Sequence, residues 1–373
     1  MYIQIDKAGF VNKGAELMLF SIMDRLGKEK NLNPIFVAGR GIGRAESIRK
    51  AGLFQKVNLQ RLNIPFEKLF DQYRFEQYGL IKENKINAVL DAGGFQFGDQ
   101  WEYLYSTENN LELKRYYKKL KNHGAKIVFM PQAFGPFNKP LSLQRIKIVF
   151  EYADKIYARD RISYKYLEEV FGENQKISIS PDFTNLLKPD ISLSNYLLAK
   201  DAICIIPNSK MLTHTPDEIK TKYIPFLIAL ISHYLANGEK IILLNHEGSD
   251  DFAIINEIKN KTNVELPVLN GLNALEIKAC IKHFKLLISS RYHGVASGLN
   301  QGVQTYCTSW SHKYKELMDL YGIKNGILDV NTSFEKALAQ LNNYEVNGKL
   351  EDNIAIVEVT VDRMWKDIIT NII

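Results

Sequence analysis

The sequence has little cysteine and no long hydrophobic run. Its 373 residues include three cysteines, Cys204, Cys280 and Cys307, which lie far apart. Such spacing does not make a disulfide framework and is typical of a reducing compartment. No apolar stretch approaches the ~20 residues that a membrane helix needs, and residues 1–6 do not begin a signal peptide. We expect a cytoplasmic protein, and peripheral attachment at the inner face of the membrane stays open.

Motifs for nucleotides, metals and nucleic acids are also missing. There is no G-x-x-x-x-G-K-[ST] loop, and residues 39–43 lack the G-x-G-x-x-G spacing and the acidic residue that should follow it. No zinc-finger or H-E-x-x-H spacing occurs. The net charge of +6, from 48 basic and 42 acidic residues, is spread along the chain, which favours an anionic substrate or membrane surface over nucleic acid. We therefore predict no metal, no cofactor and no nucleic-acid partner.

The hydrophobic pattern favours an α/β fold with parallel sheets, because strand-like and helix-like segments alternate. We predict two Rossmann-like domains facing a central cleft, residues 1–193 and 194–352, with a C-terminal helix over 353–373 that crosses back to the first. The expected strands are 2–5, 34–38, 88–91, 126–130, 155–158, 202–206, 240–244, 286–289 and 303–307. The first expected helix begins at Lys13. Further helices are expected over residues 112–122, 143–153, 162–170, 216–237 and 274–284 and in the tail.

The most informative segment is residues 289–294, Ser-Ser-Arg-Tyr-His-Gly. It follows an expected buried strand and precedes an expected helix of small residues. Ligands bind at such strand ends in open α/β sheets, and Ser, Arg and His together suit a phosphorylated or carboxylated substrate. The alternative also stays open, in which Arg291 forms a surface ion pair and His293 is a core histidine.

Two glycine-containing segments follow strands of the expected first domain. In residues 12–16, Gly14 would let the backbone approach a ligand, while Glu16 fits either a ligand contact or a helix-dipole charge. Residues 91–99 contain paired glycines that suit a tight turn or close approach of a ligand. Within them, Gln96 and Asp99 could hold sugar hydroxyls.

Three further strand ends carry polar residues. Residues 131–136, with two prolines and a glycine, predict a rigid loop. Arg159 is a candidate oxyanion clamp, with Asp160 near a helix start and Ser163 in its first turn; a surface charge cluster is the alternative. Residues 245–251 contain His246 and Glu247, which could polarise a sugar hydroxyl, whereas Asp250 or Asp251 could simply cap the next helix.

Taken in order, these motifs resemble the polysaccharide pyruvyltransferase family over about residues 1–325. The matching residues are Asn12–Glu16, Asp91-Ala92-Gly93-Gly94, Pro131-Gln132, Arg159-Asp160 with Ser163, Pro181-Asp182, His246 with the following acidic pair, Ser290-Arg291-Tyr292-His293-Gly294 and Lys313. Two positions differ from the family pattern: Tyr292 replaces an aliphatic residue of some relatives, and no proline follows Gly302.

The resemblance implies a GT-B-like fold and a transferase that uses phosphoenolpyruvate. The acceptor would be a sugar of a surface polysaccharide or its lipid-linked precursor, and the product a cyclic pyruvate ketal. It implies His293, Arg291 and Lys313 as catalytic residues. Donor contacts would come from Arg159, Ser290, Arg291, Tyr292, His293, Gly294 and Lys313. Acceptor contacts would come from Asn12, Gly14, Glu16, Gly93, Gly94, Gln96, Asp182, His246 and Glu247.

Two rival functions share these features. A nucleotide-sugar glycosyltransferase would have the same fold, and a carbohydrate-binding protein without activity would keep the cleft. Residues 116–121 mix lysines with apolar residues, which fits either contact with a membrane surface or a solvated helix face. The acceptor sugar, the ketal stereochemistry, the base for the acceptor hydroxyls and the oligomeric state leave no signal in the sequence.

Overall fold

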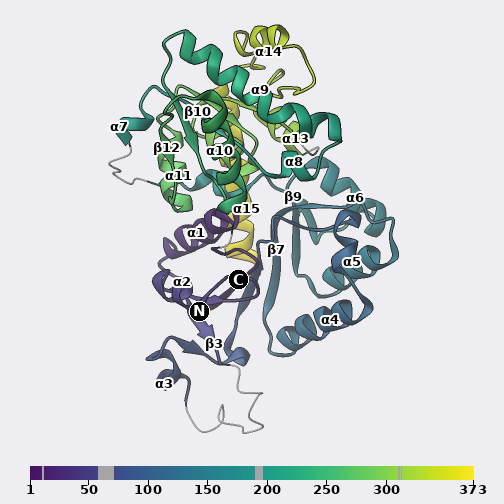
Figure 1. Ribbon diagram of the computed structural model, residues 1–373. Helices are drawn as coiled ribbons and strands as arrows, with labels where there is room; N and C mark the ends of the chain where they lie inside the picture. Colours follow the sequence, from purple (N-terminus) through teal and green to yellow (C-terminus); the bar gives the residue numbers. More distant parts are fainter. Residues whose placement is uncertain (11, 58–70, 190–195, 310, 312) are drawn as a thin grey trace. The chain divides into compact units, whose positions relative to one another are not determined.

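The computed structural model describes residues 1–10, 12–57, 71–189, 196–309, 311 and 313–373 (Figure 1). Contacts divide the chain into two units. The first comprises residues 1–11, 15–187 and 360–373, and the second comprises residues 12–14 and 188–359. Each unit is built on a parallel sheet with helices between successive strands, so the predicted α/β class is confirmed.

Within the described residues, the first unit has a nine-stranded sheet in the order β4-β3-β2-β1-β5-β7-β8-β9, with β6 paired to the end of β7. Its strands are β1 (Tyr2–Asp6), β2 (Ile35–Ala38), β3 (Phe54–Lys56), β4 (Leu80–Ile81), β5 (Ala88–Asp91), β6 (Phe95–Phe97), β7 (Lys126–Phe134), β8 (Lys155–Ala158) and β9 (Ile177–Ile179). The chain order reverses between β1 and β5. The carboxyl ends of these two strands therefore form the switch point where open α/β sheets bind ligands.

Helices of the first unit cover the sheet with apolar side chains. They are α1 (Lys13–Gly27), α2 (Ala45–Lys50), α3 (Gln72–Glu76), α4 (Thr107–Asn122), α5 (Pro140–Tyr152) and α6 (Arg161–Phe171). Leu113 of α4, Ile146 of α5 and Leu167 of α6 share one core cluster with Phe129 of β7. The α4 helix begins five residues earlier than predicted, because Ser106 accepts a hydrogen bond from Asn109 N and caps it.

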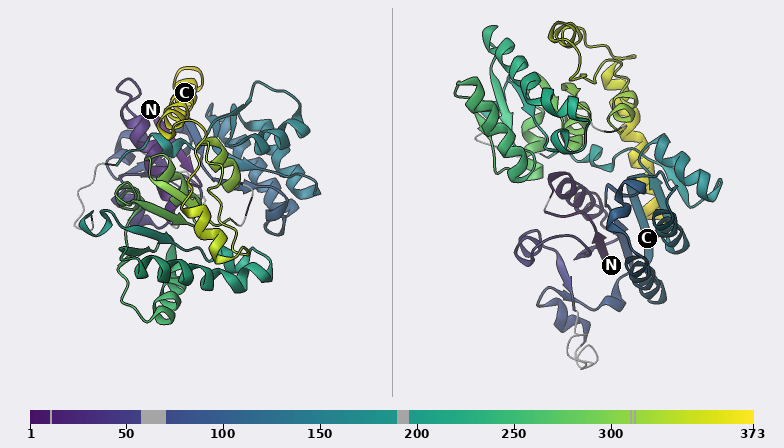
Figure 2. Two further views of the ribbon diagram at one scale, coloured as in Figure 1. Left: turned by 90° about the horizontal axis from the view of Figure 1, so that it is seen from above. Right: turned by 45° about the vertical axis from the view of Figure 1, so that its right-hand side comes forward.

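The C-terminal helix α15 (Leu350–Asp367) shows the predicted amphipathic pattern. Its apolar positions Val361, Met364 and Trp365 are buried, and Figure 2 shows it as one continuous helix. The Trp365 ring lies edge-to-face with Phe183, at 5.9 Å between centroids. Residues from 360 onward group with the first unit, so the end of this helix completes the core of that unit.

The second unit has a sheet in the order β12-β11-β10-β13-β14. Its strands are β10 (Ile203–Ile206), β11 (Ile241–Leu244), β12 (Val268–Leu269), β13 (Leu286–Ser289) and β14 (Gln304–Cys307). Its helices include α7 (Tyr196–Ala199), α8 (Lys210–Thr213), α9 (Asp217–Ala236), α10 (Gly248–Thr262), α11 (Ala274–Ile281), α12 (Tyr292–Leu299), α13 (Lys313–Leu320) and α14 (Phe334–Leu341). The switch point of this sheet lies between β10 and β13, directly before residues 289–294.

Alternation along the buried strands supplies a core on each face of the second sheet. Ile203 and Ile205 of β10 join a cluster with α9, α10 and α14. Cys204 and Ile206, which alternate with them along β10, join a second core cluster with α11. Strands buried on both faces are expected when helices cover both sides of a parallel sheet. Among the described helices, none is both long enough and apolar enough to cross a membrane.

Candidate active site

Residues 289–294 form a tight turn from β13 into α12. Arg291 occupies the N-cap position of α12, and its backbone N–H donates to Ser289 Oγ at 3.1 Å. A β-carbon at Gly294 would lie 2.6 Å from Ser289 Oγ and 3.2 Å from Ile206 Cδ1. Gly294 therefore lets α12 pack closely on the sheet, and its contact with the donor stays a prediction.

The Arg291 guanidinium is held by two carboxylates of the second unit. Its Nε and Nη2 donate to the two oxygens of Asp251 at 2.7 and 2.6 Å, and its Nη1 donates to Glu247. Burial alone would lower the pKa of Arg291, but the Asp251 hydrogen bonds and the two negative charges raise it above its ordinary value. The alternative of a surface ion pair is wrong, because the Arg291 side chain is 12% exposed and that of Asp251 is 0% exposed.

Ser290 is the centre of a buried hydrogen-bond network. Its hydroxyl lies 2.6 Å from both Tyr223 OH and Thr308 Oγ1. Its carbonyl accepts hydrogen bonds from Asn208 Nδ2 and Tyr314 OH, each at 2.7 Å. The hydroxyl is thus engaged inside the protein, and its contact with the donor stays a prediction. Ser290 instead fixes the backbone from which Arg291 projects.

His293 and Lys313 lie around the Tyr292 ring. The His293 ring is edge-on to Tyr292 at 5.3 Å between centroids, and Lys313 Nζ lies 5.4 Å from the Tyr292 centroid. Contacts group residues 12–14 with this unit, and a β-carbon at Gly14 would lie 2.1 Å from His293 Nδ1. Lys313 thus lies beside the turn that carries Arg291 and His293, and a side chain at position 14 would have to displace the His293 imidazole.

His246 follows β11 and is 5% exposed. Burial lowers its pKa well below the usual value, and the positive charges of Arg291 and His293 lower it further. The imidazole is therefore uncharged near neutral pH. It lines a hollow of about 350 Å³ together with Asn245, Phe252 and other residues.

Two buried carboxylates meet at the switch point of the first sheet. Asp6 and Asp91 are registered neighbours on β1 and β5, and each is 1% exposed. Asp6 accepts hydrogen bonds from Arg40 N at 3.0 Å and from Tyr116 OH at 2.7 Å. Burial and then the Asp6 charge raise the pKa of Asp91 to about 7.

The glycine-containing loop after β5 folds onto Asp91. The Asp91 carboxylate accepts from Gly93 N at 3.2 Å and from the Gln96 amide. A β-carbon at Gly93 would lie 2.2 Å from Gln96 Nε2 and would displace the Gln96 amide from Asp91, and the φ of +67° at Gly94 favours glycine there. The Gln96 amide holds this loop through Asp91, and Asp99 accepts hydrogen bonds from Asn138 N and Lys139 N before α5. Both side chains are partly exposed, and their contacts with sugar hydroxyls stay predictions.

Arg159 and Asp182 form a buried ion pair in the first unit. Arg159 Nη1 lies 3.7 Å from Asp182 Oδ2, with side chains 4% and 2% exposed. Asp182 also accepts from Thr184 Oγ1 at 2.7 Å. Asp160 caps α6 through Ser163 N at 2.7 Å, as predicted. The surface charge cluster considered for Arg159 is thus wrong.

Asn12 and Glu16 belong to the start of α1. Asn12 Oδ1 accepts from Gly14 N at 2.8 Å, and Glu16 is a buried residue of the first turn. Residues 116–121 do not present their aromatics outward, since Tyr117 is in the core and Tyr116 donates a hydrogen bond to Asp6. Lys118 and Lys119 of the same helix are exposed, and contact with a membrane surface stays a prediction.

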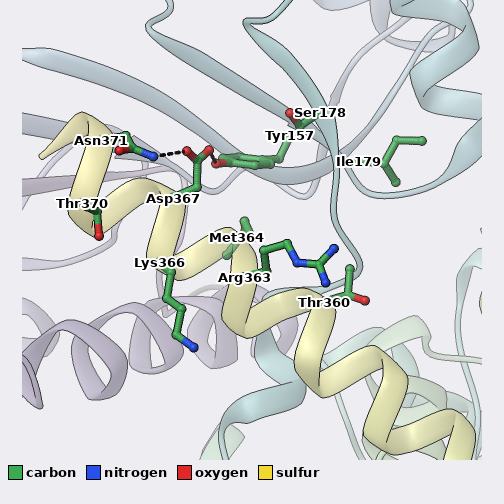
Figure 3. Close-up of a pocket in the computed structure, with 10 residues that line it drawn as sticks. All are labelled: Tyr157, Ser178, Ile179, Thr360, Arg363, Met364, Lys366, Asp367, Thr370 and Asn371. Carbon is green, nitrogen blue, oxygen red and sulfur yellow. Dashed lines mark hydrogen bonds between the residues drawn. The ribbon is translucent and has the colours of Figure 1, made fainter.

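A second hollow, of about 560 Å³, lies between β8, β9 and the C-terminal helix. Figure 3 shows Tyr157 and Asn371 directed at the Asp367 carboxylate, which accepts from both. None of the residues predicted from the sequence lines it. In the described part of the chain, no group of three or more His, Cys, Asp or Glu side chains could hold a metal ion.

The sequence interpretation missed four elements of these sites: the Asp6 carboxylate, the Tyr116 hydroxyl, the Ser290 network and the role of Asp251. The position of Asp6 in the sequence was a visible signal, because Asp6 directly follows the first predicted strand, just as Asp91 ends the third. Asp251 had a weaker signal, as one of two adjacent acidic residues that fit equally well as helix caps.

Parallel sheets with charged residues at both switch points define an α/β protein with the usual ligand-binding edges of open sheets. The family model for polysaccharide pyruvyl transferase matches residues 12–312. The chain therefore belongs to the polysaccharide pyruvyl transferase family, whose members are transferases acting on polysaccharides. A search of the curated proteins finds no match.

Solved structures resemble this chain over almost its whole length at low identity. The UDP-GlcNAc 2-epimerase of Methanocaldococcus jannaschii has a TM-score of 0.58 at 12% identity, covering 96% of this chain and 99% of its own. The Neisseria meningitidis UDP-GlcNAc 2-epimerase, bound to UDP-GlcNAc, has 0.59 at 10% identity and 100% coverage of both chains. A Rickettsia africae glycosyltransferase has 0.54 at 13% identity and 99% coverage of both. These similarities show the GT-B-like fold.

Proposed function

We propose that the protein transfers the pyruvyl group of phosphoenolpyruvate to two hydroxyls of one sugar. The acceptor belongs to a surface polysaccharide or its lipid-linked precursor, and the products are a cyclic pyruvate ketal and phosphate. The observation that supports the proposal is the turn at residues 289–294, which carries Arg291 and His293 directly after β13, with Lys313 Nζ 5.4 Å from the centroid of the Tyr292 ring in the same turn. Family membership supports the same reaction class.

The donor requires positive charge. Phosphoenolpyruvate carries about two to three negative charges near neutral pH, because a phosphate ester has its second pKa near 6. Arg291 and Lys313 of the second unit, and Arg159 of the first, are the proposed cations. Arginine suits this role because its planar fork pairs with carboxylate or phosphate through two hydrogen bonds.

The chemistry requires one acid. His293 is the proposed acid, because a protonated imidazole could protonate the donor methylene carbon and make C2 electrophilic. One acceptor hydroxyl attacks C2, the C2–O bond to phosphate breaks, and the second hydroxyl closes the ring. The two acceptor hydroxyls lose two protons. One of them replaces the proton that His293 gave to the new methyl group, and the other leaves with phosphate. The reaction therefore needs no oxidant or reductant.

The acceptor hydroxyls require a proton acceptor. His246 is a candidate because burial keeps it uncharged, and a neutral imidazole can accept a hydrogen bond. Asp182 and Glu247 are the other candidates. Asn12, Gly14, Glu16, Gly93 and Gly94 remain proposed acceptor contacts, since they lie at strand ends or helix starts. We place the reaction in the cytoplasm, at the inner face of the membrane when the acceptor is lipid-linked.

A ligand panel tests this function. Thermal stability is measured with phosphoenolpyruvate, UDP, GDP, CMP and buffer alone, since a ligand of the folded state adds about 2.7 kcal/mol at a hundredfold excess over Kd. A shift with phosphoenolpyruvate that Arg291→Ala abolishes supports the proposal. A shift with UDP or GDP and none with phosphoenolpyruvate refutes it, and supports a nucleotide-sugar glycosyltransferase. Phosphate release with a lipid-linked acceptor then tests turnover.

A further inference from the structure

The two carboxylates on Arg291 differ in how firmly they are held. Asp251 is completely buried, uses both oxygens on the guanidinium and also accepts from Ser209 N at 2.9 Å. Glu247 is 25% exposed and contacts a single nitrogen, Nη1. Asp251 is thus a fixed partner of Arg291, and Glu247 is an exchangeable one.

Glu247 can leave Arg291 at little structural cost. It is the N-cap residue of α10, yet its side chain caps no backbone N–H of that helix. The next residue, Gly248, has φ of +64°, and a β-carbon placed on it would have no atom beyond its chain neighbours within 4 Å, so the space there is uncrowded. Displacing the Glu247 carboxylate would therefore break its bond to Arg291 without breaking a cap.

Charge also favours exchange. Arg291 with two carboxylates sums to one negative charge, which repels a donor carrying about two to three negative charges. With Glu247 displaced, the Arg291–Asp251 pair is neutral and Nη1 is available for an anionic oxygen. A carboxylate is also one of the two anionic groups of phosphoenolpyruvate, so Glu247 is a chemical equivalent of the ligand.

We propose that Asp251 is the positioning residue that orients Arg291, and that Glu247 occupies the place of an anionic oxygen of the donor until the donor displaces it. This inference rests on the proposed function, in which Arg291 binds the donor. It predicts opposite effects from two carboxylate-to-amide changes on the same arginine.

Titration calorimetry with phosphoenolpyruvate tests the proposal on the full chain. We expect Glu247→Gln to bind about tenfold more tightly, because a competing charged hydrogen bond is lost. We expect Asp251→Asn to bind at least about tenfold more weakly, because the guanidinium loses its fixed carboxylate. Asp250→Asn is the matched control, because Asp250 is next to Asp251 in the sequence and is exposed. The affinity of this variant for phosphoenolpyruvate should equal that of the wild type.

Kinetics separate positioning from mere stability. The KM for phosphoenolpyruvate should fall in Glu247→Gln and rise in Asp251→Asn, a pair of opposite changes that general destabilisation cannot produce. Removing one partner of a buried ion pair is destabilising, so unliganded melting is recorded for each variant. If Asp251→Asn does not fold, Glu247→Gln decides the question, since Glu247 is partly exposed.

Each outcome has one interpretation. Wild-type binding of phosphoenolpyruvate with equal or weaker binding by Glu247→Gln overturns this inference and leaves the proposed function intact. Unchanged affinity in a folded Asp251→Asn does the same. Absence of phosphoenolpyruvate binding in the wild type and in every variant overturns the proposed function together with the inference.

Discussion

The carboxyl group of Asp91 makes stability depend on pH in a direction opposite to that of a salt-bridged aspartate. Its pKa is raised from 3.8 to about 7, first by burial and then by the Asp6 charge, while Lys7 and the Gln132 hydrogen bond lower it. A raised pKa in the folded state means that stability is fully present below the unfolded pKa and is lost as pH rises through the folded one. The window of loss therefore runs from about pH 4 to pH 7 and slightly above.

The magnitude follows from the two pKa values. Each unit of difference corresponds to about 1.4 kcal/mol, so ionising Asp91 in the folded state costs about 4 kcal/mol in full. Between pH 5.5 and pH 8 the linkage relation gives a loss of about 2 kcal/mol. That loss is large beside a net stability of about 5–15 kcal/mol, so it is measurable.

The variant Asp91→Asn tests this reasoning, because an amide keeps the hydrogen-bonding shape of the neutral acid and cannot ionise. Urea unfolding is followed at pH 5.5 and pH 8 at fixed ionic strength, by fluorescence and circular dichroism. We expect the unfolding free energy of the variant, taken relative to that of the wild type, to be about 2 kcal/mol higher at pH 8 than at pH 5.5.

Two comparisons sharpen the result. Asp6→Asn removes the neighbouring charge, so it should lower the pKa of Asp91 and reduce the loss between the two pH values. Asp24→Asn, at a partly exposed ion pair of α1 with Lys28, should leave the wild-type pH dependence unchanged because such pairs contribute little. A difference between Asp91→Asn and wild type that stays constant from pH 5.5 to pH 8 would refute the reasoning.

Three further predictions concern catalysis and packing. His293→Gln should lower the rate of phosphate release by at least about a hundredfold. Its affinity for phosphoenolpyruvate, measured by calorimetry, should change by less than about threefold, which is well under the tenfold that corresponds to about 1.4 kcal/mol. Gly294→Ala should lower unfolding free energy by about 1–3 kcal/mol in urea titrations, because its β-carbon would meet Ser289 Oγ. Trp365→Ala should cost about 3–5 kcal/mol, whereas Val359→Ala on the exposed face of α15 should stay within about 0.5 kcal/mol.

Element type was predictable wherever one hydrophobic period dominated. The predicted strand 286–289 coincides with β13, and the amphipathic tail is α15, since buried parallel strands form apolar runs in the sequence and half-buried helices form stripes. The prediction of a loop at residues 131–136 is wrong, because β7 continues to Phe134. Proline cannot donate to a ladder, but the pairing of β7 with β8 is irregular between Phe129 and Gln132, so Pro131 falls where a donor is not needed.

The site was predictable at strand ends and not beyond them. The fold class implied that residues after β13 face the switch point, and Arg291 does lie there. Its partners Asp251 and Glu247 are 40 and 44 residues earlier in the chain, and no local pattern connects residues at that separation. Whether a given acidic residue caps a helix or holds an arginine depends on which strands are neighbours, and the strand order is a property of the assembled sheet.

The two switch points share one physical feature, which is charge buried where the sheets open. A buried ionised group is costly unless it is paired, and even a paired one rarely stabilises more than an apolar replacement would. In the second unit Arg291 contacts two carboxylates, those of Glu247 and Asp251. In the first unit the carboxyl groups of Asp6 and Asp91 are neighbours. Neither arrangement follows from packing, since β5, β10 and β13 beneath them are mostly apolar and buried along their whole length. Because departures from the rules of a stable core concentrate at functional sites, each switch point is a candidate functional site of its own unit, and the second is the one that we propose for the anionic donor.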